Sequence, residues 1–174
     1  MYLNRITNCG EDTGEWYLDY AQSLDPAALV QVPGVKIFTD GGSCNVPAMS
    51  VAYPGGGMGD LYFTQQELNQ LVAEIAGQGY QLAVHALGDQ AIEQTLNAIE
   101  TVNGGGSNPM RHRIEHNATV RPDMIERYSQ VNPVALIFGH FSACLWQGDT
   151  SQFKYILGED YRAWDWPYGS LIEA

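Results

Sequence analysis

Three residues of types that can bind a metal ion stand at comparable places along this 174-residue chain. Lys36 interrupts a short apolar run, His85 closes a second apolar run, and His116 closes a later short segment that reads as a strand. Neutral imidazole is a common ligand of divalent cations, and a lysine can contribute once it has been modified. Three such donors can in principle hold Zn²⁺ with a fourth position open. The set could form one common site of ligand-type residues, provided that the fold brings the three segments together.

Strands and helices must alternate along the chain to position these residues. Thr64 and Glu67 carry the signature of a capping box at the start of one helix. Asp89 is placed to cap the next helix, and Pro122 opens a third. The expected strands are residues 35–39, 80–85, 113–116 and 134–138, with a weaker candidate at 5–7. The expected helices begin near residues 64, 89, 122 and 168, and a less regular helical region covers 151–156.

Repeated strand–helix units predict an α/β fold with a parallel sheet. A closed (β/α)₈ barrel needs about 250 residues. The chain is therefore either a small open α/β domain or a piece of a barrel. In α/β barrels, active-site residues project from the C-terminal ends of the strands, which is where the two histidines are expected.

Side-chain alternation along the strands predicts which way the candidates point. If Leu82 and Val84 face the helices, His85 points to the opposite, inner face. The same alternation turns Lys36 inward. On the expected strand 113–116, His116 shares its face with Ile114, and Glu115 is expected to point away from His116.

Each candidate also has a structural explanation. A single histidine at a strand end is more often a hydrogen-bonded structural residue than a metal ligand. Two histidines at corresponding places of successive units, His85 and His116, favour a site. An inward lysine must lose its hydration, which is costly unless it is paired or modified. The alternative for Lys36 is an exposed position on an edge strand.

Three further polar residues are weaker candidates for binding substrate. Asp40 opens an Asp-Gly turn, where aspartate is common for conformational reasons. Asp89 is explained most simply as a helix N-cap. His140 follows the fourth strand and could touch a substrate, although a surface loop is the simpler explanation.

Composition excludes some functions. Eight basic against 20 acidic side chains give a formal net charge of −12, which argues against nucleic acid and against anionic membrane surfaces as partners. The three cysteines are widely spaced and predict no disulfide framework. A reducing cytoplasm is the corresponding expectation for the location.

Three motifs together resemble the amidohydrolase 3 family, in its YtcJ-like branch related to N-substituted formamide deformylase. They are Val35–Gly41 (VKIFTDG), His85–Asp89 (HALGD) and Arg111–His116 (RHRIEH). Their order and spacing both match. The resemblance extends over nearly the whole chain, from about residue 35 to the end.

The resemblance implies a (β/α)₈ barrel of the metal-dependent hydrolase type with one or two divalent metal ions, zinc being the expected one. Lys36 matches the fourth-strand lysine that bridges metals, often after carboxylation by CO₂. His85 and His116 match the ligands of the fifth and sixth strands. The implied reaction is hydrolysis of a C–N bond in a small amide, formamide or cyclic amide by metal-activated water.

The chain also departs from the family pattern. The first-strand His-x-His pair is absent, and the chain stops where the eighth-strand aspartate, the family's general base, is expected. We therefore expect residues 1–174 to be an internal piece of one barrel domain, about strands 3 or 4 to 7, and we assign no catalytic residue. The alternative is a non-catalytic α/β fragment that folds by self-association or with a missing segment. In either case, exposed barrel edges favour a homo-oligomer.

Overall fold

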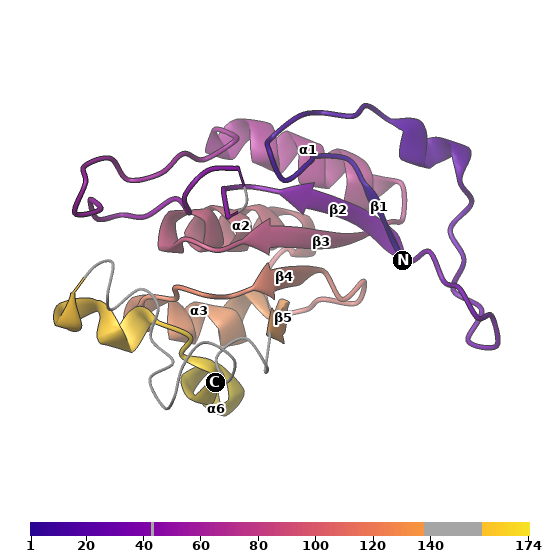
Figure 1. Ribbon diagram of the computed structural model, residues 1–174. Helices are drawn as coiled ribbons and strands as arrows, with labels where there is room; N and C mark the ends of the chain where they lie inside the picture. Colours follow the sequence, from indigo (N-terminus) through magenta and orange to yellow (C-terminus); the bar gives the residue numbers. More distant parts are fainter. Residues whose placement is uncertain (43, 138–157) are drawn as a thin grey trace.

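The computed structural model describes residues 1–42, 44–137 and 158–174. Five parallel strands form one sheet in the order β1-β2-β3-β4-β5, which is also their order along the chain. The strands are β1 (Tyr2–Asn4), β2 (Gly34–Phe38), β3 (Gln81–Ala86), β4 (Arg113–His116) and β5 (Val134–Ile137). Figure 1 shows the arrows of β2, β3 and β4 running in the same direction, so that their C-terminal ends lie at the same end of the sheet.

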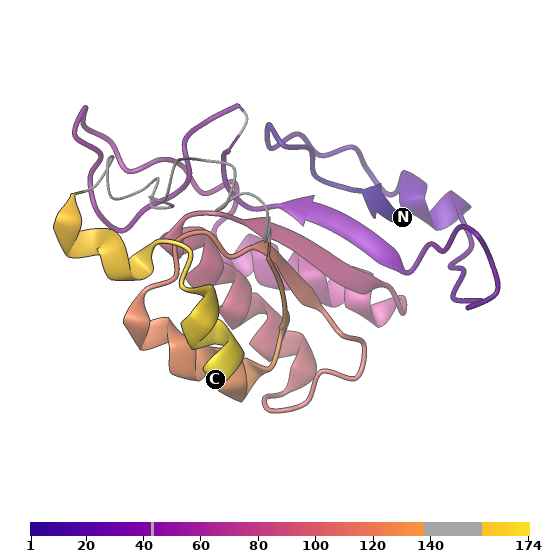
Figure 2. The ribbon, with the colours of Figure 1, turned by 60° about the horizontal axis from the view of Figure 1, so that its bottom comes forward.

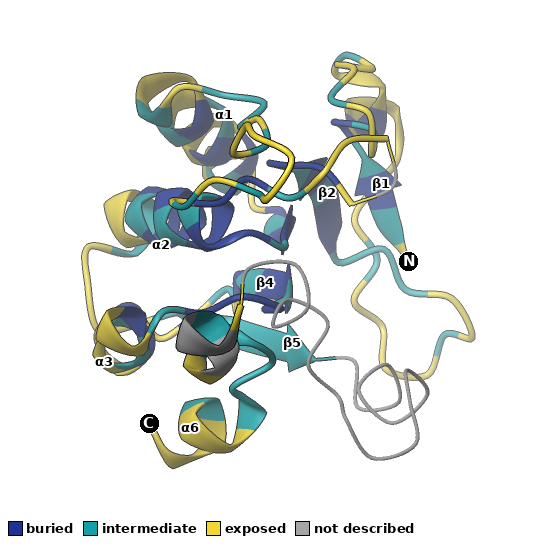
Figure 3. Ribbon diagram, turned by 60° about the vertical axis from the view of Figure 1, so that its left-hand side comes forward, coloured by how far each residue is buried: buried dark blue, intermediate teal, exposed yellow. Residues whose placement is uncertain are grey.

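Helices alternate with the later strands. Among the described residues they are the α-helices α1 (Gln65–Gly77), α2 (Asp89–Asn103), α3 (Pro122–Val131) and α6 (Tyr168–Glu173), and the 3₁₀ helices η1 (Trp16–Asp19) and η2 (Glu159–Trp164). Helices α1, α2 and α3 lie in a row against one face of the sheet (Figures 2 and 3). This is the expected α/β arrangement of successive strand–helix units.

The helix starts follow from the sequence, with one exception. Helix α1 begins with the predicted capping box, in which Thr64 and Glu67 each accept from the other's backbone N–H. Pro122 opens α3 as its first residue. The prediction that Asp89 caps α2 is wrong, because Gly88 holds the cap position and Asp89 is the first helical residue. Only a glycine fits there, since a Cβ on Gly88 would lie 2.0 Å from the carbonyl oxygen of Ala48.

The core lies between the sheet and the helix row. Apolar residues of β1, β2 and β3 pack with α1, among them Val35, Ile37, Leu82 and Val84. A second cluster joins α2 and α3 to β4 and the end of β3. Val35, Ile37, Leu82 and Val84, the residues of the first cluster that lie on β2 and β3, are fully buried. Burial of this face fixes the register, because a slip by one residue would turn every apolar side chain away from the helices.

Two expectations about the N-terminal part are corrected. The first strand is Tyr2–Asn4, not residues 5–7, and Ile6 instead makes an isolated bridge with Asp12. Cys9 and Cys44 form a disulfide with their Cα atoms 5.3 Å apart, which corrects the prediction that the cysteines take no part in a disulfide framework. The sequence does not predict this pair, because Cys9 and Cys44 are far apart along the chain and only the fold brings their loops together. The bridge removes the premise of the reducing cytoplasm, and that location stays a prediction.

Over the described ranges, no helix has both the length and the apolar character needed to cross a bilayer. The expected strand end at Phe138 and the expected helical region 151–156 lie outside the described residues.

Candidate metal centre

The face of the sheet opposite the helices carries the predicted site. In the strand register, Lys36 is level with Ala83, and Phe38 is level with His85. The next strand places Glu115 level with His85. All of these side chains therefore share the inner face. Lys36 lies on an interior strand, which excludes the edge-strand alternative. Glu115 lies on the inner face, to which His116 also turns, so the prediction that Glu115 points away from His116 is wrong.

His116 reaches this face in a different way from the one predicted. It is level with Ala86 on the neighbouring strand, and Ile114, two residues earlier, is buried in the helix-side core. Regular alternation would therefore turn His116 toward the helices. Its backbone instead has φ +81°, which is unusual for a residue other than glycine. The ring accordingly lies edge-on to that of His85, with the two centroids 4.5 Å apart.

A continuous line of side chains connects the three predicted ligands. The Lys36 Nζ lies 4.9 Å from the centroid of the Phe38 ring. Phe38 stacks on the imidazole of His85 at 4.5 Å between centroids, and His85 contacts His116. The sequence reasoning missed Phe38, although it lies two residues after Lys36 and so must share its face. The fold thus brings Lys36, His85 and His116 together.

The hydrogen bond of His85 determines which ring nitrogen is free. Its Nε2 lies 3.0 Å from the carbonyl oxygen of Gly41 and 3.4 Å from Oδ1 of Asp40. A carbonyl oxygen only accepts, so Nε2 carries a proton, and in the neutral form of the ring the lone pair is on Nδ1. His85 is only 6% exposed, and its Nδ1 is buried without a hydrogen-bond partner in the described structure. A buried lone pair fixed by a carbonyl on the other ring nitrogen is the arrangement found in metal-binding histidines.

Burial changes the charge states of the other two candidates in the direction that metal binding needs. The pKa of His116 is lowered to about 3 by burial and by the nearby His85 and Lys36, so its imidazole is neutral at pH 7. The pKa of Lys36 is lowered to about 8, chiefly by burial, although the charge of Glu115 opposes the shift. Glu115 is itself paired with Arg113, whose guanidinium also lowers the pKa of Lys36. The lysine is thus far closer to neutrality than an exposed one.

Asp40 lies beside the site and holds its neighbouring loop. Its fully buried carboxylate accepts from three backbone N–H groups: Ala48 and Gly88 donate to Oδ2, and Leu87 donates to Oδ1. These bonds join the loop after β2 to the end of β3. Substrate binding by Asp40 stays a prediction, and the hydrogen bonds explain its burial without a substrate.

Asp89 and its neighbour in α2 fasten the same loop from the other side. Asp89 Oδ1 accepts from the backbone of Ser50, and Oδ2 pairs with Arg121 at 2.9 Å. Gln90 Nε2 donates to the carbonyl of Met49. The loop is therefore held at Ala48–Ser50, beyond the C-terminal ends of the strands. Asp89 as a substrate-binding residue stays a prediction, and His140 lies outside the described residues.

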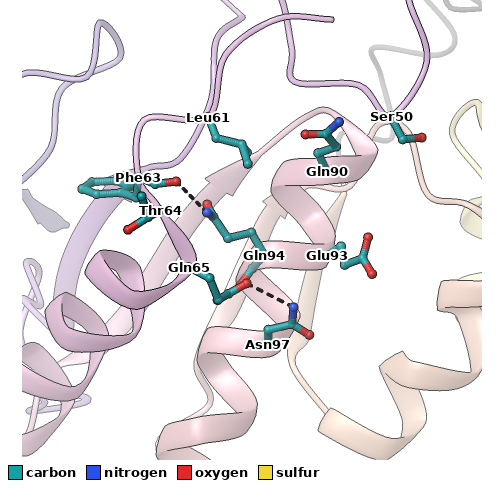
Figure 4. Close-up of a pocket in the computed structure, with 9 residues that line it drawn as sticks. All are labelled: Ser50, Leu61, Phe63, Thr64, Gln65, Gln90, Glu93, Gln94 and Asn97. Carbon is teal, nitrogen blue, oxygen red and sulfur yellow. Dashed lines mark hydrogen bonds between the residues drawn. The ribbon is translucent and has the colours of Figure 1, made fainter.

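A hollow between α1 and α2 lies on the helix side and is lined by amide side chains (Figure 4). Gln94 Nε2 donates to the carbonyl of Phe63, and Asn97 donates to Gln65 Oε1. These amides join the two helices and the segment before α1. The hollow therefore has a structural explanation, and it contains none of the predicted ligands.

The donor set remains one of two imidazoles and a lysine. Within the described ranges, no group of three or more His, Cys, Asp or Glu side chains is placed to hold a metal ion. Among the predicted ligands, Lys36 is the one on the inner face besides the two histidines. The neutral histidine His116, the free Nδ1 of His85 and the low pKa of Lys36 fit a divalent cation.

Comparisons with known proteins identify the family of the chain. The sequence model of the Amidohydrolase family matches residues 10–158, and the chain belongs to that family. It is 30% identical over 96 residues to the exoenzymes regulatory protein AepA of Pectobacterium carotovorum subsp. carotovorum, a match that covers 54% of this chain and 20% of the relative.

Two solved structures are similar in fold. An uncharacterized metal-dependent hydrolase from Pyrococcus horikoshii OT3 matches with a TM-score of 0.68 and 26% identity, over 83% of this chain and 29% of that one. A second, from Pyrococcus furiosus, matches with a TM-score of 0.76 and 23% identity, over 99% of this chain and 34% of that one. The chain thus has the α/β fold of part of a (β/α)₈ barrel and spans about a third of each structure or less.

Proposed function

We propose that the protein to which this chain belongs is a metal-dependent hydrolase, and that Lys36, His85 and His116 supply three of its metal ligands. The observation that carries the proposal is the buried, unpartnered Nδ1 of His85, whose ring is fixed by the Gly41 carbonyl. Membership of the amidohydrolase family and the likeness to metal-dependent hydrolases support it.

The side chains of the inner face have distinct roles in this proposal. His85 and His116 bind through neutral nitrogens, and Phe38 shields one face of the His85 ring from water. Asp40 and the Gly41 carbonyl keep that ring in one orientation. A divalent metal at such a site lowers the pKa of bound water and polarises a carbonyl. We propose zinc as the ion, one or two per barrel, and a small amide, formamide or cyclic amide as the substrate.

Lys36 acts as an anionic ligand in this scheme after carboxylation by CO₂. The neutral amine attacks the carbon of CO₂, loses a proton and becomes a carbamate. A pKa of about 8 makes about half of the amine neutral at pH 8. Carboxylation also removes the cost of a cation buried on the inner face.

Isotope labelling tests the role of Lys36. Protein equilibrated with ¹³C-bicarbonate should show a carbamate carbon by NMR, and the Lys36→Ala variant should lose both this signal and most of the bound metal. Lys154→Ala, which removes the chain's other lysine, is the matched control and should keep both. Equal metal content in the two variants would exclude Lys36 as a ligand.

We also propose that residues 1–174 are one piece of a single barrel domain and that the isolated chain associates with itself. Strands β1 and β5 are the two edges of the described sheet, and unpaired edges favour pairing with another chain. Exposed apolar side chains near the N-terminus, including Leu24, Leu29 and Val30, add to this tendency. Light scattering should give a mass above that of one 19.2 kDa chain. A monomer at tens of micromolar would contradict self-association and leave the metal site as a separate question.

A further inference from the structure

The Cys9–Cys44 disulfide joins two loops that are far apart in the sequence, and one of them borders the candidate metal centre. The two cysteines are separated by 35 residues, and both are exposed. Their Cα separation of 5.3 Å lies within the range typical of disulfides. The bridge is therefore accessible to a reductant in solution.

The Cys44 side of the bridge belongs to the turn that contacts His85. The Gly41 carbonyl accepts the His85 Nε2–H, and Gly42 donates to the Asn45 carbonyl, which closes a turn around Cys44. A Cβ on Gly42 would lie 3.4 Å from Cε1 of His85, so the backbone of this turn packs against the imidazole. A change at Cys44 acts only three residues away from the atom that orients His85.

The Cys9 side is held firmly to the sheet. Residues 7–11 form a tight loop, in which the Thr7 N–H donates to the Glu11 carbonyl and the Glu11 N–H donates to Thr7 Oγ1. The Arg5 N–H, directly after β1, donates to the Lys36 carbonyl. The Tyr62 hydroxyl donates to the Asn8 carbonyl. These hydrogen bonds anchor the Cys9 loop independently of the disulfide bond itself, so the bridge ties Cys44 to a fixed part of the sheet.

We propose that the Cys9–Cys44 disulfide is a redox-sensitive clasp on the metal site: the oxidised bridge holds the Gly41 carbonyl against His85, and reduction releases the turn and weakens metal binding. Reduction by a dithiol breaks the Sγ–Sγ bond, which takes up two electrons and two protons to give two thiols, while the dithiol becomes a disulfide. The inference about metal affinity rests on the proposed metal centre. The inference about the His85 ring does not, because the ring and its carbonyl partner belong to this chain alone.

The first measurement uses the metal-free chain. The imidazole NMR signals of His85, assigned with a His85→Gln variant, are compared before and after dithiothreitol treatment. We expect the Nε2–H to be protected from exchange only in the oxidised protein. Cys144→Ser should behave like the wild type, and Cys9→Ser/Cys44→Ser should resemble the reduced protein under both conditions. Identical His85 signals in the two redox states would overturn the proposal.

The second measurement is the zinc dissociation constant of both redox forms, determined by competition with a chelator. Loss of a partner that orients a ligand typically weakens metal binding about 10- to 100-fold, and we expect a reduction-dependent change of this size in the wild type and in Cys144→Ser. Equal affinities in the two forms would contradict the clasp. Absence of zinc binding in the oxidised form would refute the metal centre instead, and the His85 signals would still decide whether the bridge positions the ring. Three free thiols in the unfolded, unreduced protein would show that no bridge exists and would also overturn the proposal.

Discussion

Removal of the Asp40 carboxylate should detach the loop after β2 from the end of β3, beside the candidate metal centre. The carboxylate is fully buried and accepts three backbone N–H groups, from Ala48, Leu87 and Gly88. A buried donor left without an acceptor costs about 1–3 kcal/mol. Three donors lose their acceptor, and structural relaxation and water entry reduce the cost for each. We therefore expect Asp40→Ala to lower the free energy of unfolding by about 3–5 kcal/mol, the lower part of the summed range.

Asp40→Asn gives a graded version of the same test. Its single carbonyl oxygen can take the place of Oδ2, which accepts from Ala48 and Gly88, but its NH₂ group then faces the Leu87 N–H. One donor loses its acceptor, so the expected cost is about 1–3 kcal/mol. Urea unfolding at pH 7, followed by circular dichroism, measures both variants.

Asp123→Ala is the matched control, since Asp123 is also paired but its side chain is 68% exposed. Surface ion pairs contribute about 0–1 kcal/mol, so this variant should stay within about 1 kcal/mol of the wild type. If Asp40→Ala destabilised the chain no more than the control, the loop would not depend on Asp40. The carboxylate would then be better explained as a residue kept for substrate.

Two further changes test the packing and the protonation described above. Gly34→Ala should destabilise the chain by about 3 kcal/mol or prevent folding, because its Cβ would lie 1.9 Å from the Gln81 carbonyl oxygen. Gly55→Ala is the control: its Cβ meets open space, so the free energy of unfolding in urea should change by less than about 0.5 kcal/mol. Equal stability of the two variants would contradict the described register. Burial lowers the pKa of His112 to about 4 in the folded state against 6.5 normally, so protons bind the unfolded chain first as the pH falls. The free energy of unfolding of the wild type should therefore fall by about 2 kcal/mol through this group between pH 7 and pH 4.5. In His112→Asn, Oδ1 can still accept the Leu82 N–H, which donates to His112 Nδ1 in the wild type, so the variant should lose about 2 kcal/mol less over the same range. Parallel pH profiles of the two proteins would refute the buried neutral state.

Local signals determined most of the fold from the sequence. The capping box at Thr64, the proline at the start of α3 and the apolar stripe of α2 each depend on nearby residues, and each element formed where it was expected. Asp89 was misplaced by one position because a fully buried carboxylate bonded to Ser50 and Arg121 has the same sequence signature as a cap. The sequence pattern does not contain that long-range contact.

The site was predictable where side chains follow regular alternation. Lys36 and His85 lie on the inner face for the reason given by the pattern. His116 reaches the same face through a left-handed backbone conformation at the end of β4, which side-chain alternation along a strand does not predict. For the same reason, Glu115 was assigned to the wrong face. The Cys9–Cys44 bridge depends on two loops that meet only in the folded chain.

The most direct test of the metal centre is elemental analysis of the purified chain after gel filtration. Wild type is compared with His85→Ala/His116→Ala, and with His112→Asn as the histidine control outside the site. Stoichiometric metal in the wild type and in His112→Asn, with its loss in the double variant, is the expected result. Equal metal content in all three proteins, or none in the wild type, would contradict the assignment of these residues as metal ligands in this chain.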